Sequence, residues 1–262
     1  MISLFHPAES NIPAINNLVK LVLAFSLFAA GLVSADHGHV DTDTGADIDK
    51  LRPYNAEYRT TARGLRLTLQ RELKINADGI HTLTNGGKLL VAGFLEKSVF
   101  EVAGTQIIPG SYVYQGSGLL NRRREVHFTP GTDTLRSLYK DVWYDLPYTE
   151  GTLDRMSQQE QLRLLLLNDP TPKDDIVITV ADGKRVKSYQ LVFIGEELLD
   201  TPLGPVQTLH FERVHKDSER SSNTWLAPAW DYMMVKTVHV EDGKPVEATL
   251  TKANIDGIAL GH

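Results

Sequence analysis

The chain has 262 residues, no cysteine and a formal net charge of −6. The absence of cysteine excludes disulfides, thiol nucleophiles and thiolate metal sites. The negative charge argues against a nucleic-acid-binding protein, which needs a basic surface.

The first element is an apolar run at 21–33, which follows Lys20 and leads into small residues up to Ala35. A positive charge, an apolar core and a small-residue cleavage site are typical of a secretory signal. Thirteen helical residues span about 20 Å, less than the roughly 30 Å hydrocarbon core of a bilayer. We therefore expect residues 1–35 to be a signal peptide cleaved between Ala35 and Asp36. The mature chain would have no membrane span and would be periplasmic.

Residues 36–50 contain five aspartates and few apolar side chains, a composition that predicts a disordered mature N-terminus. His37 and His39, with the neighbouring aspartates, have the ligand types of a divalent-metal site. A flexible tail loses entropy when it is ordered around a metal, so a solvated tail is the simpler interpretation. No cofactor motif is present, and we expect no cofactor.

From residue 51 onward the pattern is mostly that of β-strands. Leu65, Leu67 and Leu69 alternate with polar residues, which indicates a strand with one buried face. Asp182-Gly183 and Asp242-Gly243 are strong hairpin signals between such runs, whereas Leu135–Trp143 reads as a single strand. We count ten or eleven strands with short connections, so neighbours should pair antiparallel. They predict one β-rich domain over residues 51–253, followed by a C-terminal tail at 254–262.

The stretch 153–167 is the strongest helix signal in the chain. Ser157 and Glu160 fit a capping box, with Thr152 or Asp154 as alternative caps of a longer helix. Pro170 disfavours helical geometry just before it. The last two turns are apolar nearly all round, so the helix should be buried on more than one side. Because many twisted strands tend to curl or close, we predict an antiparallel curved sheet or half-barrel that wraps this helix.

Two interpretations of the helix surface are open. Leu162, Leu165 and Leu166 would be core partners of the sheet, or part of their surface would line a groove for an apolar ligand. Glu160 and Arg163 are within pairing distance on one face. Either they form an ion pair at the rim of the sheet, or they make a polar contact inside a ligand groove.

Two other groups are candidates for ligand contact. Arg122 and Arg124 lie in the densest positive segment of the chain. They would be solvated edge charges that discourage strand addition, or they would bind a phosphate or lipid head group. Trp225 would serve packing at a turn or act as a ligand platform.

Five short segments carry a resemblance to a known family: Tyr54-x-Ala56-x-Tyr58, Leu153-Asp154-Arg155-Met156-Ser157, Gly195-Glu196-Glu197, Thr201-Pro202-Leu203-Gly204 and Trp225-Leu226-Ala227-Pro228. In their order and spacing they resemble the bacterial envelope family catalogued as domain of unknown function 3108, over roughly residues 51–253. The resemblance implies an exported, mostly β protein, similar in shape to the half-barrels of lipoprotein carrier proteins, and it supplies no activity or catalytic residues. The chain departs from the family pattern at Ala229 and at Met233-Met234-Val235.

No G-x-S-x-G, H-E-x-x-H, Walker A or Rossmann glycine pattern is present, and we predict no catalytic residues. The leading hypothesis is a half-barrel that binds or carries a lipid or another apolar or amphipathic envelope molecule. The alternatives are a scaffolding protein with a filled core, which would bind an envelope protein, and an enzyme acting on an envelope polymer. A roomy apolar groove favours the first, a filled interior the second, and two converging carboxylates the third.

Overall fold

The computed structural model describes residues 51–62, 65–89, 92–119, 121–171, 176–215 and 219–261. The expected signal peptide, its cleavage between Ala35 and Asp36, the acidic segment 36–50 and the candidate ligands His37 and His39 lie outside these residues.

The described strands form one sheet in which nearly every strand pairs with its neighbours in sequence. The order is β8-β7-β6-β5-β4-β3-β2-β1-β15-β14-β13-β12-β11-β10-β9, with β16 beside β15. Pairing is antiparallel apart from β9–β10, which is parallel. The strands are β1 (Tyr54–Ala62), β2 (Leu65–Ile75), β3 (His81–Leu89), β4 (Ala92–Ala103), β5 (Gln106–Gly118), β6 (Arg123–Phe128), β7 (Thr134–Tyr139), β8 (Val142–Pro147), β9 (Thr152–Leu153), β10 (Ile176–Asp182), β11 (Arg185–Thr201), β12 (Gly204–Arg213), β13 (Ser221–Ala227), β14 (Met233–Glu241), β15 (Lys244–Ile255) and β16 (Ile258–Ala259).

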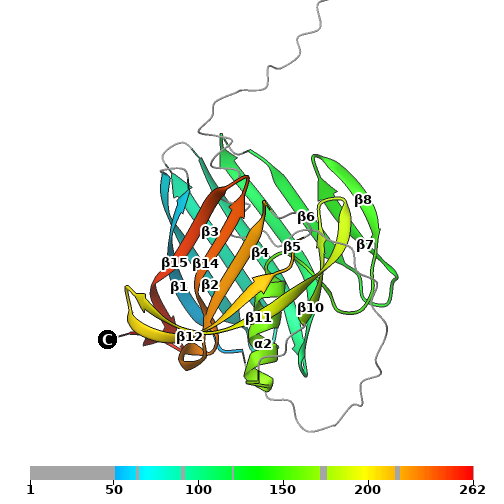
Figure 1. The fold of residues 1–262 in the computed structure, drawn as a ribbon. Helices are drawn as coiled ribbons and strands as arrows, with labels where there is room; N and C mark the ends of the chain where they lie inside the picture. The colour runs from blue at the N-terminus through cyan, green and yellow to red at the C-terminus, as the bar shows by residue number, and fades with distance from the viewer. Residues whose placement is uncertain are drawn as a thin grey trace, which may run out of the picture.

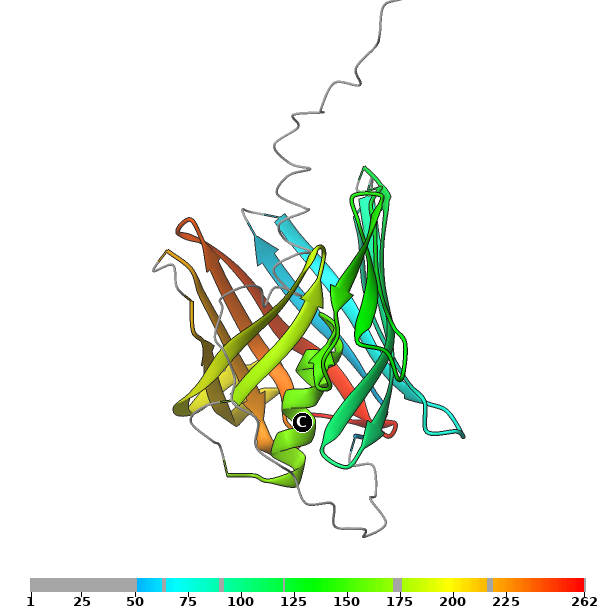
Figure 2. The ribbon, with the colours of Figure 1, turned by 90° about the vertical axis from the view of Figure 1, so that its right-hand side faces the viewer.

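The sheet curves strongly and encloses the helix α2 (Ser157–Asn168) on its concave side (Figures 1 and 2). It does not close by backbone pairing, because β8 and β9 are the two ends of the strand order. Side chains connect the two halves instead. Ser137 Oγ donates to the carbonyl of Gly183 at 2.5 Å, and Arg124 lies 3.5 Å from Asp182. The predicted fold class, a mostly β curved sheet around one helix, is confirmed.

Buried and more exposed residues alternate along the strands, as the alternation of apolar and polar residues in the sequence predicted. Along β1, Tyr54, Ala56, Tyr58 and Thr60 are buried, while the residues between them are more exposed. In β2, Leu67 and Leu69 lie in the core, as their alternation predicted. The concave face therefore supplies one wall of the core, and α2 supplies the other.

Sixteen strands are described in place of the ten or eleven expected. The segment 135–143 is not one strand, since β7 turns at Lys140 and Asp141 into β8. Both turn residues have positive φ, 51° and 63°, the conformation of a type I′ hairpin that glycine or asparagine usually signals. The hairpins expected at Asp182-Gly183 and Asp242-Gly243 are present. The boundary expected at residue 253 falls inside β15, and the expected tail at 254–262 contains the end of β15 and the short strand β16, which ends at Ala259.

The helix begins four residues later than the stretch predicted from 153, because Thr152–Leu153 pairs with β10 as a strand. The expected capping box between Ser157 and Glu160 is wrong. Asp154 Oδ1 instead accepts from the backbone N–H groups of Met156 and Ser157, while Ser157 Oγ accepts from the N–H of Asp154. This reciprocal pattern satisfies N–H groups that the first turn leaves unpaired.

Burial of α2 on more than one side is confirmed. Leu162, Leu164 and Leu166 are at most 5 % exposed, and Leu165 and Leu167 are half-buried. The polar Gln161 is buried as well. Its side chain accepts from the N–H of Ile107 and donates to the carbonyl of Thr105, which fixes the helix to the end of β5.

Candidate functional site

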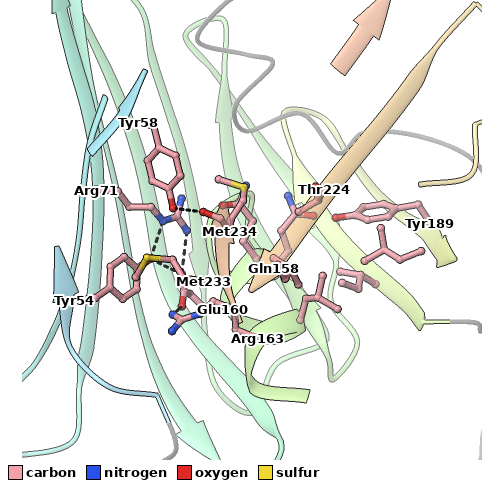
Figure 3. A pocket seen from close by; sticks show the side chains of 15 residues that line it. Tyr54, Tyr58, Arg71, Gln158, Glu160, Arg163, Tyr189, Thr224, Met233 and Met234 are labelled. Carbon is pink, nitrogen blue, oxygen red and sulfur yellow. Dashed lines mark hydrogen bonds and ion pairs between the residues drawn. The ribbon is translucent and has the colours of Figure 1, made fainter. Parts of the chain in front are cut away.

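A cavity lies between α2 and the concave face of the sheet (Figure 3). It comprises about 510 Å³ of empty space, part of which is open to solvent. Much of its wall is apolar and comes from Leu162 of the helix and from strands of the second half of the sheet, through Ile178, Leu191, Leu226 and Met233.

One wall of the cavity carries a buried cluster of charges. Glu160 Oε1 accepts from Tyr54 Oη at 2.7 Å and from Arg71 Nη2 at 3.1 Å, and its Oε2 accepts from Arg163 Nη1. Arg71 Nε also donates to Tyr54 Oη at 2.8 Å. Glu160, Arg71 and Arg163 are 1 %, 4 % and 3 % exposed. The expected pair of Glu160 and Arg163 is present; of its two interpretations, the position at the rim of the sheet is wrong, because both side chains are buried and line the cavity.

The protonation states in this cluster follow from burial and from neighbouring charges. Burial by itself would raise the pKa of Glu160, but Arg163, Arg71 and the hydrogen bond from Tyr54 outweigh it and lower that pKa. Burial raises the pKa of Tyr54 well above its usual value and that of Tyr58 to about 12. Glu160 is therefore an anion and both tyrosines are neutral, so the cluster has two cations and one anion.

Three buried polar atoms of the cavity wall have no hydrogen-bond partner in the described part of the chain: Gln158 Oε1, Arg163 Nη2 and Thr224 Oγ1. Their side chains are 2 %, 3 % and 6 % exposed. In the view of Figure 3, Gln158 and Thr224 lie between Tyr189 and the cluster around Glu160. Since buried polar groups are nearly always paired with protein or water, the wall has hydrogen-bonding capacity for a molecule inside the cavity.

Three of the candidate ligand contacts, Glu160, Leu162 and Arg163, line this cavity. Leu166 is buried in the core beside it, and Leu165 is only half-buried; neither is part of the lining.

The other three candidates lie elsewhere. Arg122 is exposed, and the half-buried Arg124 pairs with Asp182, which accounts for its charge without a ligand. Trp225 alternates along β13 with the cavity-lining Thr224 and Leu226, so its ring is on the opposite face. There its Nε1 donates to Glu197 at 2.7 Å, and the ring stacks on His210.

Sequence reasoning missed Arg71, Tyr58 and Thr224 as members of the site. For Arg71 the signal was present. It has the same parity along β2 as Leu67, Leu69 and Leu73, which places it on the buried face. No sequence signal of this kind identifies Thr224 as a site residue. It lines the cavity only because the helix packs opposite its strand.

Among the described residues, no group of three or more His, Cys, Asp or Glu side chains is placed to hold a metal ion. No helix in the described part of the chain has the length and apolar character needed to cross a membrane.

Comparison with solved structures shows a likeness of fold. A β-barrel-like protein of DUF1849 from Brucella abortus superposes with a TM-score of 0.54 at 12 % identity, covering 80 % of this chain and all of that one. A DUF1329 family protein from Desulfovibrio piger gives a TM-score of 0.27 at 11 % identity, covering 80 % of this chain and 88 % of the other. A putative outer membrane lipoprotein-sorting protein domain from Vibrio parahaemolyticus gives 0.23 at 8 % identity, covering 79 % and 86 %. The first supports the barrel-like architecture; the other two scores are too low to support an inference.

Comparison with curated protein sequences gives no significant match. The sequence model of a family described as protein of unknown function (DUF3108) matches residues 53–251, nearly the whole described domain and all five segments on which the resemblance rests. The chain belongs to the DUF3108 family.

Proposed function

We propose that this protein binds one apolar or amphipathic molecule between α2 and the concave face of the sheet, and that it carries this molecule in the bacterial envelope. The observation that best supports this proposal is the cavity itself, which combines an apolar wall with buried polar atoms that have no partner among the described residues. Export and a periplasmic location are part of the proposal and rest on the signal-like segment 1–35.

The free energy of binding depends on how much of an apolar chain the cavity buries. Burial of an acyl chain contributes about 0.8 kcal/mol per methylene, so 14 methylenes would contribute roughly 11 kcal/mol. Association opposes this with about 4–15 kcal/mol. Part of the cavity's space is open to solvent, so its wall does not enclose a bound chain completely. The chain therefore extends through the open side, or α2 shifts, and the free energy of that opening reduces the affinity.

The near-complete burial of Leu162, Leu164 and Leu166 against the sheet also supports a second function, that of a scaffolding protein with a filled core that binds another envelope protein. The enzyme alternative needed two converging carboxylates. Among the described residues that line the cavity, Glu160 is the one carboxylate, and both of its oxygens are held by cationic or phenolic donors. The geometry therefore gives the enzyme alternative no support.

The test is native mass spectrometry of the full protein purified from its own envelope, followed by solvent extraction. A stoichiometric adduct of lipid size supports carriage and identifies the cargo. A mass without adduct, also after incubation with extracted envelope lipids, would overturn binding and favour the scaffolding function.

A further inference from the structure

The cavity wall carries an excess of positive charge. Of the described residues that line it, three are charged: Arg71 and Arg163 are cations and Glu160 is an anion. All three are at least 96 % buried. A buried charge without a counter-charge is strongly unfavourable, and an ionised tyrosine does not supply one here, since burial raises the pKa of both neighbouring tyrosines.

The structure also indicates where the missing anion would bind. The guanidinium of Arg163 uses Nη1 for Glu160 and Nε for the carbonyl of Asp231 at 3.1 Å, and it lies 4.9 Å from the ring centre of Tyr54. Its Nη2 is buried and has no acceptor among the residues that the structure describes. Arg71 is more fully used, because its Nε and Nη2 both donate within the cluster. Arg163 Nη2 is therefore a fully buried donor of the cluster that is available to a ligand.

A water molecule could accept from Arg163 Nη2, but it would leave the excess charge in place. A monoanion would satisfy both the donor and the charge. The wall offers two open donors, Arg163 Nη2 and the Thr224 hydroxyl, which match the two oxygens of a carboxylate in number. A phosphate diester would bring further oxygens for which the wall offers no open donor, a sugar carries no charge, and a phosphate dianion would reverse the imbalance.

We infer that the ligand carries a carboxylate head group, which binds Arg163 inside the cavity while the apolar tail lies along the wall formed by the leucines and methionines. This inference rests on the proposed function and specifies the class of molecule: a long-chain carboxylic acid or an acylated molecule that ends in a free carboxylate. Arg163 thus takes the role of head-group contact that the sequence suggested for Arg122 and Arg124.

The experiment compares ligands that differ only in the head group. Displacement of the uncharged apolar probe N-phenyl-1-naphthylamine from the full, delipidated protein is measured at pH 8 with dodecanoate, dodecan-1-ol and dodecylamine. We expect dodecanoate to bind more tightly than the alcohol by about tenfold or more, the factor for one charge-assisted hydrogen bond, and the amine to bind most weakly. Acetate is tested separately, and we expect no displacement at the concentrations at which dodecanoate is effective.

Variants then assign the preference to a residue. Arg163→Gln should reduce the preference for dodecanoate over dodecan-1-ol to about twofold or less. Arg163→Lys, which keeps the charge but lacks the forked donor, should retain an intermediate preference. Arg124→Gln is the matched control, because that arginine is paired with Asp182 away from the cavity lining, and it should leave the preference unchanged. Circular dichroism and thermal unfolding verify that each variant is folded.

The outcomes separate the two proposals. If neither the probe nor any dodecyl ligand binds, the proposed function fails and the head-group inference fails with it. If the probe and all three ligands bind with equal affinity, binding stands and the carboxylate inference is overturned. It is also overturned if acetate is as effective as dodecanoate, which would show a free-anion site, or if Arg163→Lys and Arg163→Gln keep the full preference. The wild-type comparison decides the question of head group even if Arg163→Gln does not fold.

Discussion

Replacing Glu160 with glutamine tests the buried charge cluster directly. The carboxylate is 1 % exposed and accepts hydrogen bonds from Tyr54, Arg71 and Arg163. Glutamine has nearly the same shape but offers one acceptor oxygen and a donor amide, which would face a guanidinium donor. Two buried cations would then lack a counter-charge.

Removal of one partner from a buried ion pair destabilises a protein by about 3–5 kcal/mol. For a domain of about 200 residues this corresponds to a fall in Tm of about 6–20 °C. The free energy of unfolding of the ligand-free protein is measured by urea denaturation followed by circular dichroism. Glu247→Gln is the matched control, because that carboxylate is exposed and its pair with Lys236 spans 3.4 Å; it should lose at most about 1 kcal/mol.

The dependence of stability on pH provides a second test of the role of the Glu160 carboxylate. The pKa of Glu160 is lowered in the folded state, so its contribution to stability is present above the unfolded pKa, about 4.3, and is lost as the pH falls through the folded pKa. The difference between wild type and Glu160→Gln should therefore shrink below about pH 4. A loss of less than about 1 kcal/mol at pH 7, or a difference that does not change with acid, would refute the reasoning.

Three further predictions concern the helix and a buried histidine. Asp154→Ala removes the cap of α2 and the acceptor of Ser98, and should lower the free energy of unfolding by about 1–2 kcal/mol or more in urea denaturation; an unchanged midpoint would contradict the capping role. Leu164→Ala, at a fully buried position, should lower the free energy of unfolding by about 2–5 kcal/mol. Leu165→Ala, at a half-buried position, should lower it clearly less. Equal losses for the two variants would show that the burial pattern of the helix is wrong. Burial lowers the pKa of His239, so stability should fall as the pH drops through about 6.5, and His239→Gln should reduce this slope between pH 7 and pH 5 in thermal unfolding.

The local signals in the sequence determined the fold class. The alternation around Leu67 and Leu69 predicted half-buried strands, and the Asp-Gly pairs placed hairpins correctly. The leucine-rich stretch predicted a helix that a curved sheet must wrap. These predictions succeed because the period of a strand, the turn conformation of glycine and the all-round apolar surface of a helix are properties of neighbouring residues. The β7–β8 hairpin was missed for the same reason, since Lys140 and Asp141 carry no such signal.

The site was decided by contacts between distant parts of the chain. Arg71 and Glu160 are 89 positions apart in sequence, and Thr224 reaches the cavity from yet another strand. Local periodicity can place Arg71 on a buried face but cannot name its partner, because an arginine is buried only where the fold brings an anion or an acceptor to it. The sequence by itself therefore determined that a sheet encloses a leucine-rich helix and that this chain resembles a known family. Only the tertiary structure decided that Arg71 of β2 joins the Glu160–Arg163 pair of that helix in one buried cluster, since the balance of a buried charge depends on which side chains share the same enclosed space.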